Sequence, residues 1–96
     1  MFAVQESQPV ITGGSSIQVA FENKKRRCLV LSLSTTAYPC YVQFTPTTGM
    51  GNSIPLYAGQ SLFINPKDGQ VDWDGPVWVA CLNNQTVKVV EISNGD

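Results

Sequence analysis

The sequence predicts an all-β fold: a compact antiparallel sandwich or barrel-like domain of seven or eight short strands that follow an N-terminal arm. Between residues 56 and 91, segments with apolar side chains at alternate positions are separated by clusters of turn-forming residues. No stretch of ten or more residues has helical periodicity, and one flat sheet would expose too much apolar surface. The turn clusters are Ala58-Gly59, Asn65-Pro66-Lys67-Asp68-Gly69, Asp74-Gly75-Pro76 and Asn83-Asn84.

Length and composition indicate a single domain, residues 1–96. A chain of 96 residues builds one core and buries a modest fraction of its unfolded surface, so its stability in isolation is limited. With 43% hydrophobic residues the chain is too apolar for disorder, and 14% charged residues is far below the usual quarter. A surface with so little charge favours contact with partners.

The first sixteen residues have the composition of an arm. The segment is polar in its middle and contains Pro9 and the pair Gly13-Gly14, so we expect it to be loose and to precede the first firm strand. That strand is expected at 17–21, with Ile17, Val19 and Phe21 on a buried face.

The most central strand is expected at 28–34, because it is apolar on both faces. Leu29, Leu31 and Leu33 share one side, and the other carries Cys28 and Val30. After a turn at 34–39, residues 40–44 alternate again, and a hairpin between these two strands is the simplest pairing.

Further short strands are expected along the rest of the chain. Residues 45–53, around Met50, form the longest internal loop, and 54–56 are briefly extended. Leu62 and Ile64 face the same way, and Val71 with Trp73 suggests a short edge strand. The run 77–82 is apolar throughout and is expected to be covered on both sides. Asn83-Asn84 then closes a hairpin to residues 86–92.

Neither the charge of the chain nor a targeting signal indicates binding to a polyanion or a membrane. The net charge of −1 supplies no positive field for nucleic acid or an anionic membrane. Residues 1–5 lack the cations and following apolar region of a signal peptide, and no run reaches the roughly 20 apolar residues of a membrane span. We therefore expect the chain to be made and first kept in the cytoplasm.

The chain has three cysteines, an odd number, and they lack the spacing of a zinc or redox site. This argues against a disulfide framework as the basis of the fold. Within the expected hairpin, Cys28 lies roughly 17 Å along the strand from Cys40, too far for a bond. The favoured interpretation is that Cys28, Cys40 and Cys81 are buried and reduced, and a single pair through Cys81 is the alternative.

The residues that usually carry catalysis are scarce. The chain has no His, no Gly-x-Ser-x-Gly elbow and no phosphate-binding Gly-rich loop, so we expect no enzyme, cofactor or metal. Asp72 and Asp74 flank Trp73, so one interpretation is a catalytic carboxylate pair. Another is a calcium site that these two residues form together with Asp68. Turn formation and solubility explain these aspartates better, because no ordered calcium loop is present.

Four of the six cations lie together at 24–27, as Lys24, Lys25, Arg26 and Arg27. A plain solvated turn is the first interpretation, an acidic protein partner the second, and nucleic acid the third. The only nearby aromatic is Phe21, which the alternation assigns to the core. A sugar-stacking platform is a further alternative to core or interface roles for the aromatics Trp73, Trp78, Tyr38, Tyr41 and Tyr57.

Several segments carry a resemblance that spans about two thirds of the chain. They are Asn23 with Arg26-Arg27 leading into Leu29 to Leu33, Tyr41-Val42-Gln43-Phe44, Ile54-Pro55-Leu56 through Ala58-Gly59-Gln60-Ser61-Leu62, Gly75-Pro76-Val77-Trp78-Val79, and Val87-Lys88-Val89-Val90-Glu91. Their order resembles small β-sandwich virion proteins of tailed bacteriophages, found as capsid decoration, cement or head-associated proteins. The cysteines and the 45–53 loop are not part of that pattern.

The resemblance implies a non-enzymatic protein of the virion that binds the exterior of a phage head and stabilises the shell. Its partner would be the major capsid protein, with self-association on the particle. A head-completion, neck or tail component, or a host-glycan-binding module, is the alternative. The candidate contact residues are Phe2, Val4, Pro9, Val10, Lys24, Lys25, Arg26, Arg27 and Met50.

Overall fold

The computed structural model describes residues 2–45, 53–64 and 71–94, and these residues confirm an all-β fold. They form ten strands, somewhat more than the seven or eight expected, because two of the ten have only two residues. The strands are β1 (Phe2–Ser7), β2 (Val10–Ile11), β3 (Ser15–Ala20), β4 (Arg26–Ser32), β5 (Cys40–Gln43), β6 (Ile54–Leu56), β7 (Ser61–Ile64), β8 (Val77–Cys81), β9 (Gln85–Thr86) and β10 (Lys88–Asn94). No helix among these residues is long and apolar enough to cross a membrane.

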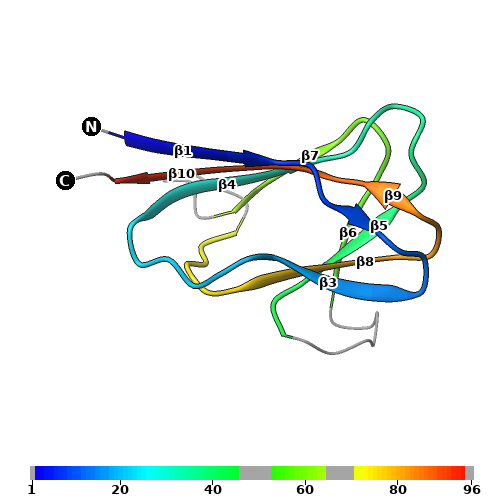
Figure 1. The fold of residues 1–96 in the computed structure, drawn as a ribbon, viewed down its shortest axis with the longest axis horizontal. Coiled ribbons are helices and arrows are strands. Elements are labelled where there is room, and N and C mark those ends of the chain that lie inside the picture. Colours follow the sequence, from blue (N-terminus) through cyan, green and yellow to red (C-terminus); the bar gives the residue numbers. More distant parts are fainter. Residues whose placement is uncertain (1, 46–52, 65–70, 95–96) are drawn as a thin grey trace.

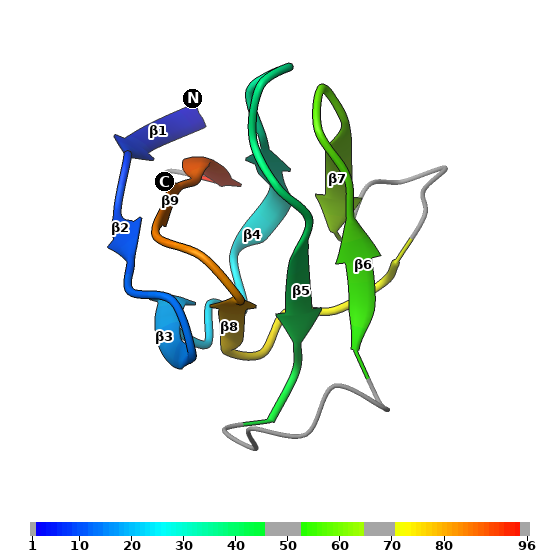
Figure 2. The same cartoon turned by 90° about the vertical axis from the view of Figure 1, so that its right-hand side faces the viewer.

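Two four-stranded antiparallel sheets form the layers of a sandwich. The first sheet has the strand order β1-β10-β4-β7 and the second β3-β8-β5-β6, while β2 and β9 make a small third pair. In Figure 1, β1, β10 and β4 run along the top and β3 and β8 lie beneath them. Figure 2 shows β2 following β1 down the side of the molecule to β3.

The core fills the space between the sheets. Leu29, Leu31 and Ile64 from the first sheet and Val42 and Val79 from the second are fully buried. Burying one such side chain contributes about 1.5–3 kcal/mol, so the two inward faces hold the layers together. The sequence prediction for Leu29, Leu31, Leu33, Leu62 and Ile64 is confirmed, as is the interior position of β4 between two other strands.

The N-terminal segment is not a loose arm that precedes the sheets. β1 pairs with β10 from Phe2 opposite Asn94 to Ser7 opposite Val89, and β2 pairs with β9. All six residues of β1 are exposed, so the strand lacks the buried face that reveals a strand in the sequence. The turn to β3 uses Gly14 at φ 81°, and a Cβ on Gly13 would meet the carbonyl oxygen of Leu82 at 2.7 Å.

Phe21 is not in the core, because the alternation of β3 is interrupted. The pairing of β3 with β8 shifts register between Gln18 and Ala20, which leaves Val19 as an extra residue. A bulge of this kind changes which later residues face inward. Ala20 is therefore buried, and Phe21 is 73% exposed.

The two hairpins expected at 28–44 and 77–92 are also wrong. β4 pairs with β10 and β7, whereas β5 pairs with β6 and β8 in the other sheet. Residues 33–39 therefore cross between the layers, and residues 82–87, which include β9, connect β8 of the second sheet to β10 of the first. Hairpins were expected because these strands are neighbours in the sequence. Connections that cross between the sheets instead place successive strands in different layers, whose apolar faces then cover each other.

The apolar run at 77–82 is buried except at Trp78, which is half-buried, and at its end. Val77, Val79, Ala80 and Cys81 are buried, whereas Leu82 is exposed where the chain leaves β8. The edge strand expected at Val71 and Trp73 is reduced to a single bridge from Val71 to Ile64.

Cys40 and Cys81 form a disulfide, which corrects the expectation of three reduced cysteines. They lie directly opposite each other on β5 and β8, with Cα atoms 4.5 Å apart, and both are fully buried. This separation is within the range that a disulfide spans. Cys28 remains a free thiol, and partial burial raises its pKa because the thiolate loses hydration.

Candidate interaction surface

The outward side of the first sheet carries an unusual number of apolar side chains. Directly opposed residues of neighbouring strands point to the same face. One row across the sheet contains Val4, Ile92 and Cys28, and the next contains Glu6, Val90, Val30 and Phe63. With Phe2, these rows define the outer face, whose apolar members are Phe2, Val4, Cys28, Val30, Phe63, Val90 and Ile92.

These side chains are accessible to solvent. Val4 is 63% exposed, Phe2 57% and Phe63 43%, while Cys28, Val30, Val90 and Ile92 are half-buried. An antiparallel sheet with one face in water normally has polar residues on that face. An accessible face with seven apolar residues is therefore typical of an interaction surface.

Polar groups border the outer face at its two ends. At one end Lys88 pairs with Glu6 at 3.4 Å, and the hydroxyls of Ser32 and Ser61 are 2.8 Å apart. At the other end the guanidinium of Arg27 lies over the ring of Phe2, 4.5 Å from its centroid. An apolar centre with a polar border is the usual arrangement of a protein interface.

Arg26 is not available to a partner, contrary to the sequence prediction. Its side chain is completely enclosed and its Nε donates to Glu91 at 2.7 Å. Its other nitrogens donate to the carbonyls of Gly75 at 2.9 Å, Trp73 at 3.2 Å and Phe21 at 2.8 Å. Arg26 thus joins the start of β4, the end of β3 and the middle of β10 to the loop before β8, which is a structural role.

The other three cations of residues 24–27, which we call the basic turn, are at the surface. Lys24 pairs with Glu22 at 3.5 Å and Asp74 at 3.6 Å, and the nearby carboxylates, Asp74 above all, raise the pKa of its ammonium. Lys25 is exposed. Only Arg27 reaches the outer face, where it contacts Phe2.

The predicted contact residues therefore separate into different regions. Phe2 and Val4 belong to the outer face, whereas Val10 is exposed on β2, beside a groove that also contains Ser32 and Lys88 from the polar end of that face. Pro9 is partly buried, and its carbonyl accepts a hydrogen bond from the amide of Val87. Met50 lies outside the described residues.

The sequence did not single out Cys28, Val30, Phe63, Val90 and Ile92 as contact residues. The signal was present for β4, which is apolar on both faces. What the sequence lacked was the pairing of β4 with β10 and β7, which joins separate apolar residues into one surface.

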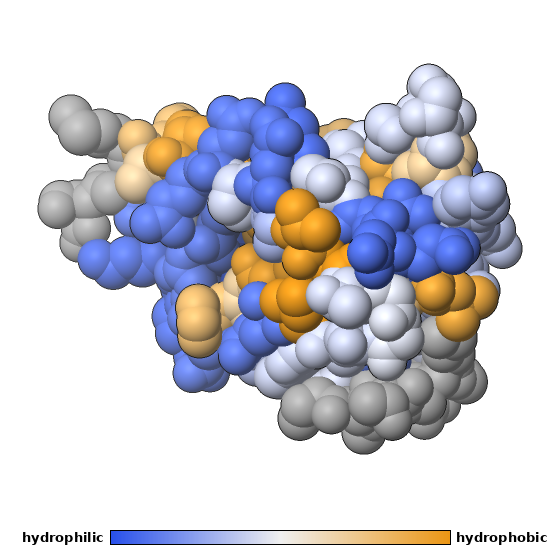
Figure 3. Space-filling model, turned by 45° about the vertical axis from the view of Figure 1, so that its right-hand side comes forward, coloured by the Kyte–Doolittle hydropathy of each residue, from blue (hydrophilic) through white to orange (hydrophobic). Residues whose placement is uncertain are grey.

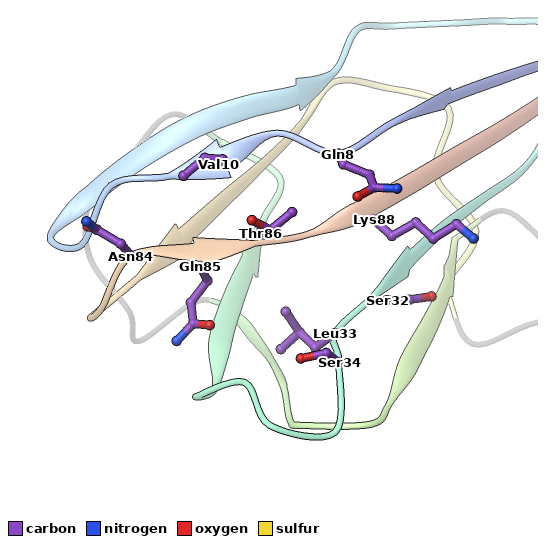
Figure 4. Close-up of a pocket in the computed structure, with 9 residues that line it drawn as sticks. All are labelled: Gln8, Val10, Ser32, Leu33, Ser34, Asn84, Gln85, Thr86 and Lys88. Atoms are coloured by element: carbon purple, nitrogen blue, oxygen red, sulfur yellow. The ribbon is translucent and has the colours of Figure 1, made fainter.

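The groove near Val10 has a volume of about 820 Å³, and most of the residues that line it carry neutral amide or hydroxyl side chains. Figure 4 shows Gln85 and Thr86 of β9 across from Leu33 and Ser34, which follow β4. Gln8, Val10, Ser32, Asn84 and Lys88 complete the lining. No acidic residue or cysteine is among these nine, and in Figure 3 the apolar surface around this end forms separate patches.

The remaining candidate residues for catalysis, sugar binding or metal binding either make contacts within the protein or do not cluster. Trp73 donates its indole N–H to the carbonyl of Pro76 at 2.9 Å and packs edge-on against Phe44, so it belongs to the core margin. Within ranges 2–45, 53–64 and 71–94, no group of three potential metal ligands occurs. Asp74 contacts Lys24, and Asp68 falls outside those ranges.

Comparisons of the chain with protein-family models, curated proteins and solved structures found no match.

Proposed function

We propose that this protein is a non-enzymatic structural component of a phage head, bound to the capsid exterior, where it stabilises the shell. The outer face is the observation that supports this proposal most directly. Seven apolar residues on one accessible sheet face fit a broad protein partner better than a small ligand. The major capsid protein is the partner that the family resemblance implies.

In this proposal, many copies bind at the seams between capsid subunits. Each contact is of modest strength, but contacts along a shell must be broken together when internal pressure opens it. A small subunit with a limited core also gains stability from the partner that it binds.

The experiment uses purified protein and expanded phage capsids. We expect the protein to co-sediment with the capsids and to raise their disruption temperature. An unchanged disruption temperature at saturating occupancy would contradict a stabilising role. Counting copies per particle by quantitative mass spectrometry separates decoration, with hundreds of copies, from the alternative neck or tail role.

A surface variant tests whether the outer face makes the contact. Phe63 lies on β7, the edge strand of this sheet farthest from β1. Phe63→Glu places a charge there, and we expect about tenfold weaker capsid binding. Leu82→Glu is the matched control, since Leu82 is also exposed but lies after β8 and outside the outer face. Equal effects of the two variants, or no effect of Phe63→Glu, would count against the outer face.

A further inference from the structure

The outermost strand of the first sheet, β1, has an open edge. β1 pairs with β10 on one side only, and Figures 1 and 2 show no strand beyond it. All six of its residues are exposed. A regular exposed edge of this length is able to pair with another strand.

The direction of the backbone groups at this edge follows from the hydrogen bonds of β10. Successive residues of an antiparallel strand direct their N–H and C=O groups alternately to the two neighbouring strands. The amide of Asn94 donates to Lys25 on the β4 side, at 2.8 Å, so Ser93 and alternate residues before it face β1. Their partners in β1 are Ala3, Gln5 and Ser7.

The bond from Val87 to Pro9, in the same register, agrees with this alternation. The N–H and C=O groups of Phe2, Val4 and Glu6 are consequently directed to the open edge. The side chains of the same three residues lie on the outer face.

We propose that β1 pairs antiparallel with β1 of a second copy of this chain, about a two-fold axis at Val4. In this register Val4 faces Val4 of the second copy, and Phe2 faces Glu6. This register matches the edge-directed residues of one copy with those of the other, and they exchange about six backbone hydrogen bonds. It also keeps the outer-face side chains of both copies on one side.

Charge complementarity supports this register. Arg27 lies over the Phe2 ring, and Phe2 faces Glu6 of the second copy. The guanidinium of Arg27 therefore meets an opposite charge across the interface, and the two-fold axis repeats this ion pair. The pairing joins two first sheets into one and makes the two outer faces continuous.

The self-association does not depend on capsid binding, so it is tested on the isolated full chain. Sedimentation velocity up to about 1 mM protein is expected to show a monomer–dimer equilibrium. Glu6→Arg and Arg27→Glu each place like charges together, and each is expected to raise the dissociation constant about tenfold or more. Combining them is expected to restore dimerisation.

The combined variant separates the interface from a structural effect within one chain. Glu6→Arg also removes the ion pair of Glu6 with Lys88, and Arg27→Glu does not restore that pair. Rescue by the combination therefore reports on contact between copies. Absence of rescue would overturn the proposed register.

A cross-link tests the two-fold axis directly. In a Cys28→Ser background, Val4→Cys places two thiols opposite each other, with Cα atoms about 5.5 Å apart, so mild oxidation is expected to give a covalent dimer. Gln5→Cys is the control, because Gln5 points to the other side of the sheet and faces Ala3 of the second copy. A monomeric wild-type chain at about 1 mM, or equal cross-linking of the two variants, would overturn the proposal.

Discussion

Arg26 belongs to a run of four cations, yet its side chain is the most enclosed charge among the described residues. Glu91 compensates its charge, and three backbone carbonyls accept hydrogen bonds from its other two nitrogens. The carbonyl of Gly75 would lose a buried hydrogen bond without Arg26, which costs free energy. The residue therefore joins segments that are far apart in the sequence.

We predict that Arg26→Ala destabilises the domain by about 3–5 kcal/mol, because it leaves Glu91 and three carbonyls without their donor. Urea unfolding measures this change in free energy, and Lys25→Ala, an exposed neighbour, is expected to change it by less than about 0.5 kcal/mol. Combining Arg26→Met with Glu91→Leu is expected to be less damaging than Arg26→Met alone. A similar small effect of both alanine variants would contradict the role of the buried ion pair.

At the scale of elements, the second sheet is locked by the bond between β5 and β8. The cysteines are 41 residues apart in the sequence, and they meet because residues 33–39 carry the chain from one sheet to the other. A hairpin of β4 with β5 would not have placed Cys40 beside β8. The disulfide thus depends on the pairing of whole strands.

We predict that removing this disulfide with Cys40→Ala and Cys81→Ala destabilises the domain by about 4 kcal/mol, because the unfolded chain loses a long closed loop. Urea unfolding with and without reductant measures the difference, and Cys28→Ser is the control that keeps the disulfide. Thiol counting under denaturing, non-reducing conditions should find one free cysteine. Finding three would show that the pair is not formed.

At the scale of the molecule, the two ends and faces differ in character. The outer face is apolar, the groove beside β9 is lined mainly by amides and hydroxyls, and the surface cations of the basic turn sit beside β4. The low overall charge means that local groups, rather than a net field, decide which surface meets a partner. A capsid contact through the outer face would involve Arg27 directly, through its position over the Phe2 ring.

We predict that Lys24→Gln combined with Lys25→Gln weakens capsid binding and flattens its dependence on salt, since both cations are exposed and directly precede the strand β4 that carries part of the outer face. Co-sedimentation at several salt concentrations measures this. Arg26 must be left intact, because its removal would destabilise the domain rather than test the turn. An unchanged salt dependence would remove the basic turn from the interface.

Local patterns in the sequence predicted the fold class, several of the turns and much of the core. Alternation at Leu29, Leu31 and Leu33, and turn residues such as Gly59 at φ 75°, are local signals that hold wherever the strand is placed. Residues Phe2 and Val4 were correctly placed at the surface, although their membership of a sheet was missed.

The pairing of the strands depends on the packing of the whole chain, and the candidate surface follows from that pairing. β4 meets β10 and β7 across long stretches of sequence, so the outer face, the Arg26 ion pair and the Cys40–Cys81 bond all join distant residues. Register shifts in β3 and at Arg27 in β4 change which residues face inward, and no local pattern announces them. Alternation of apolar side chains shows which face of a strand is buried. Which other strand covers that face depends on how all the strands of the chain pack together.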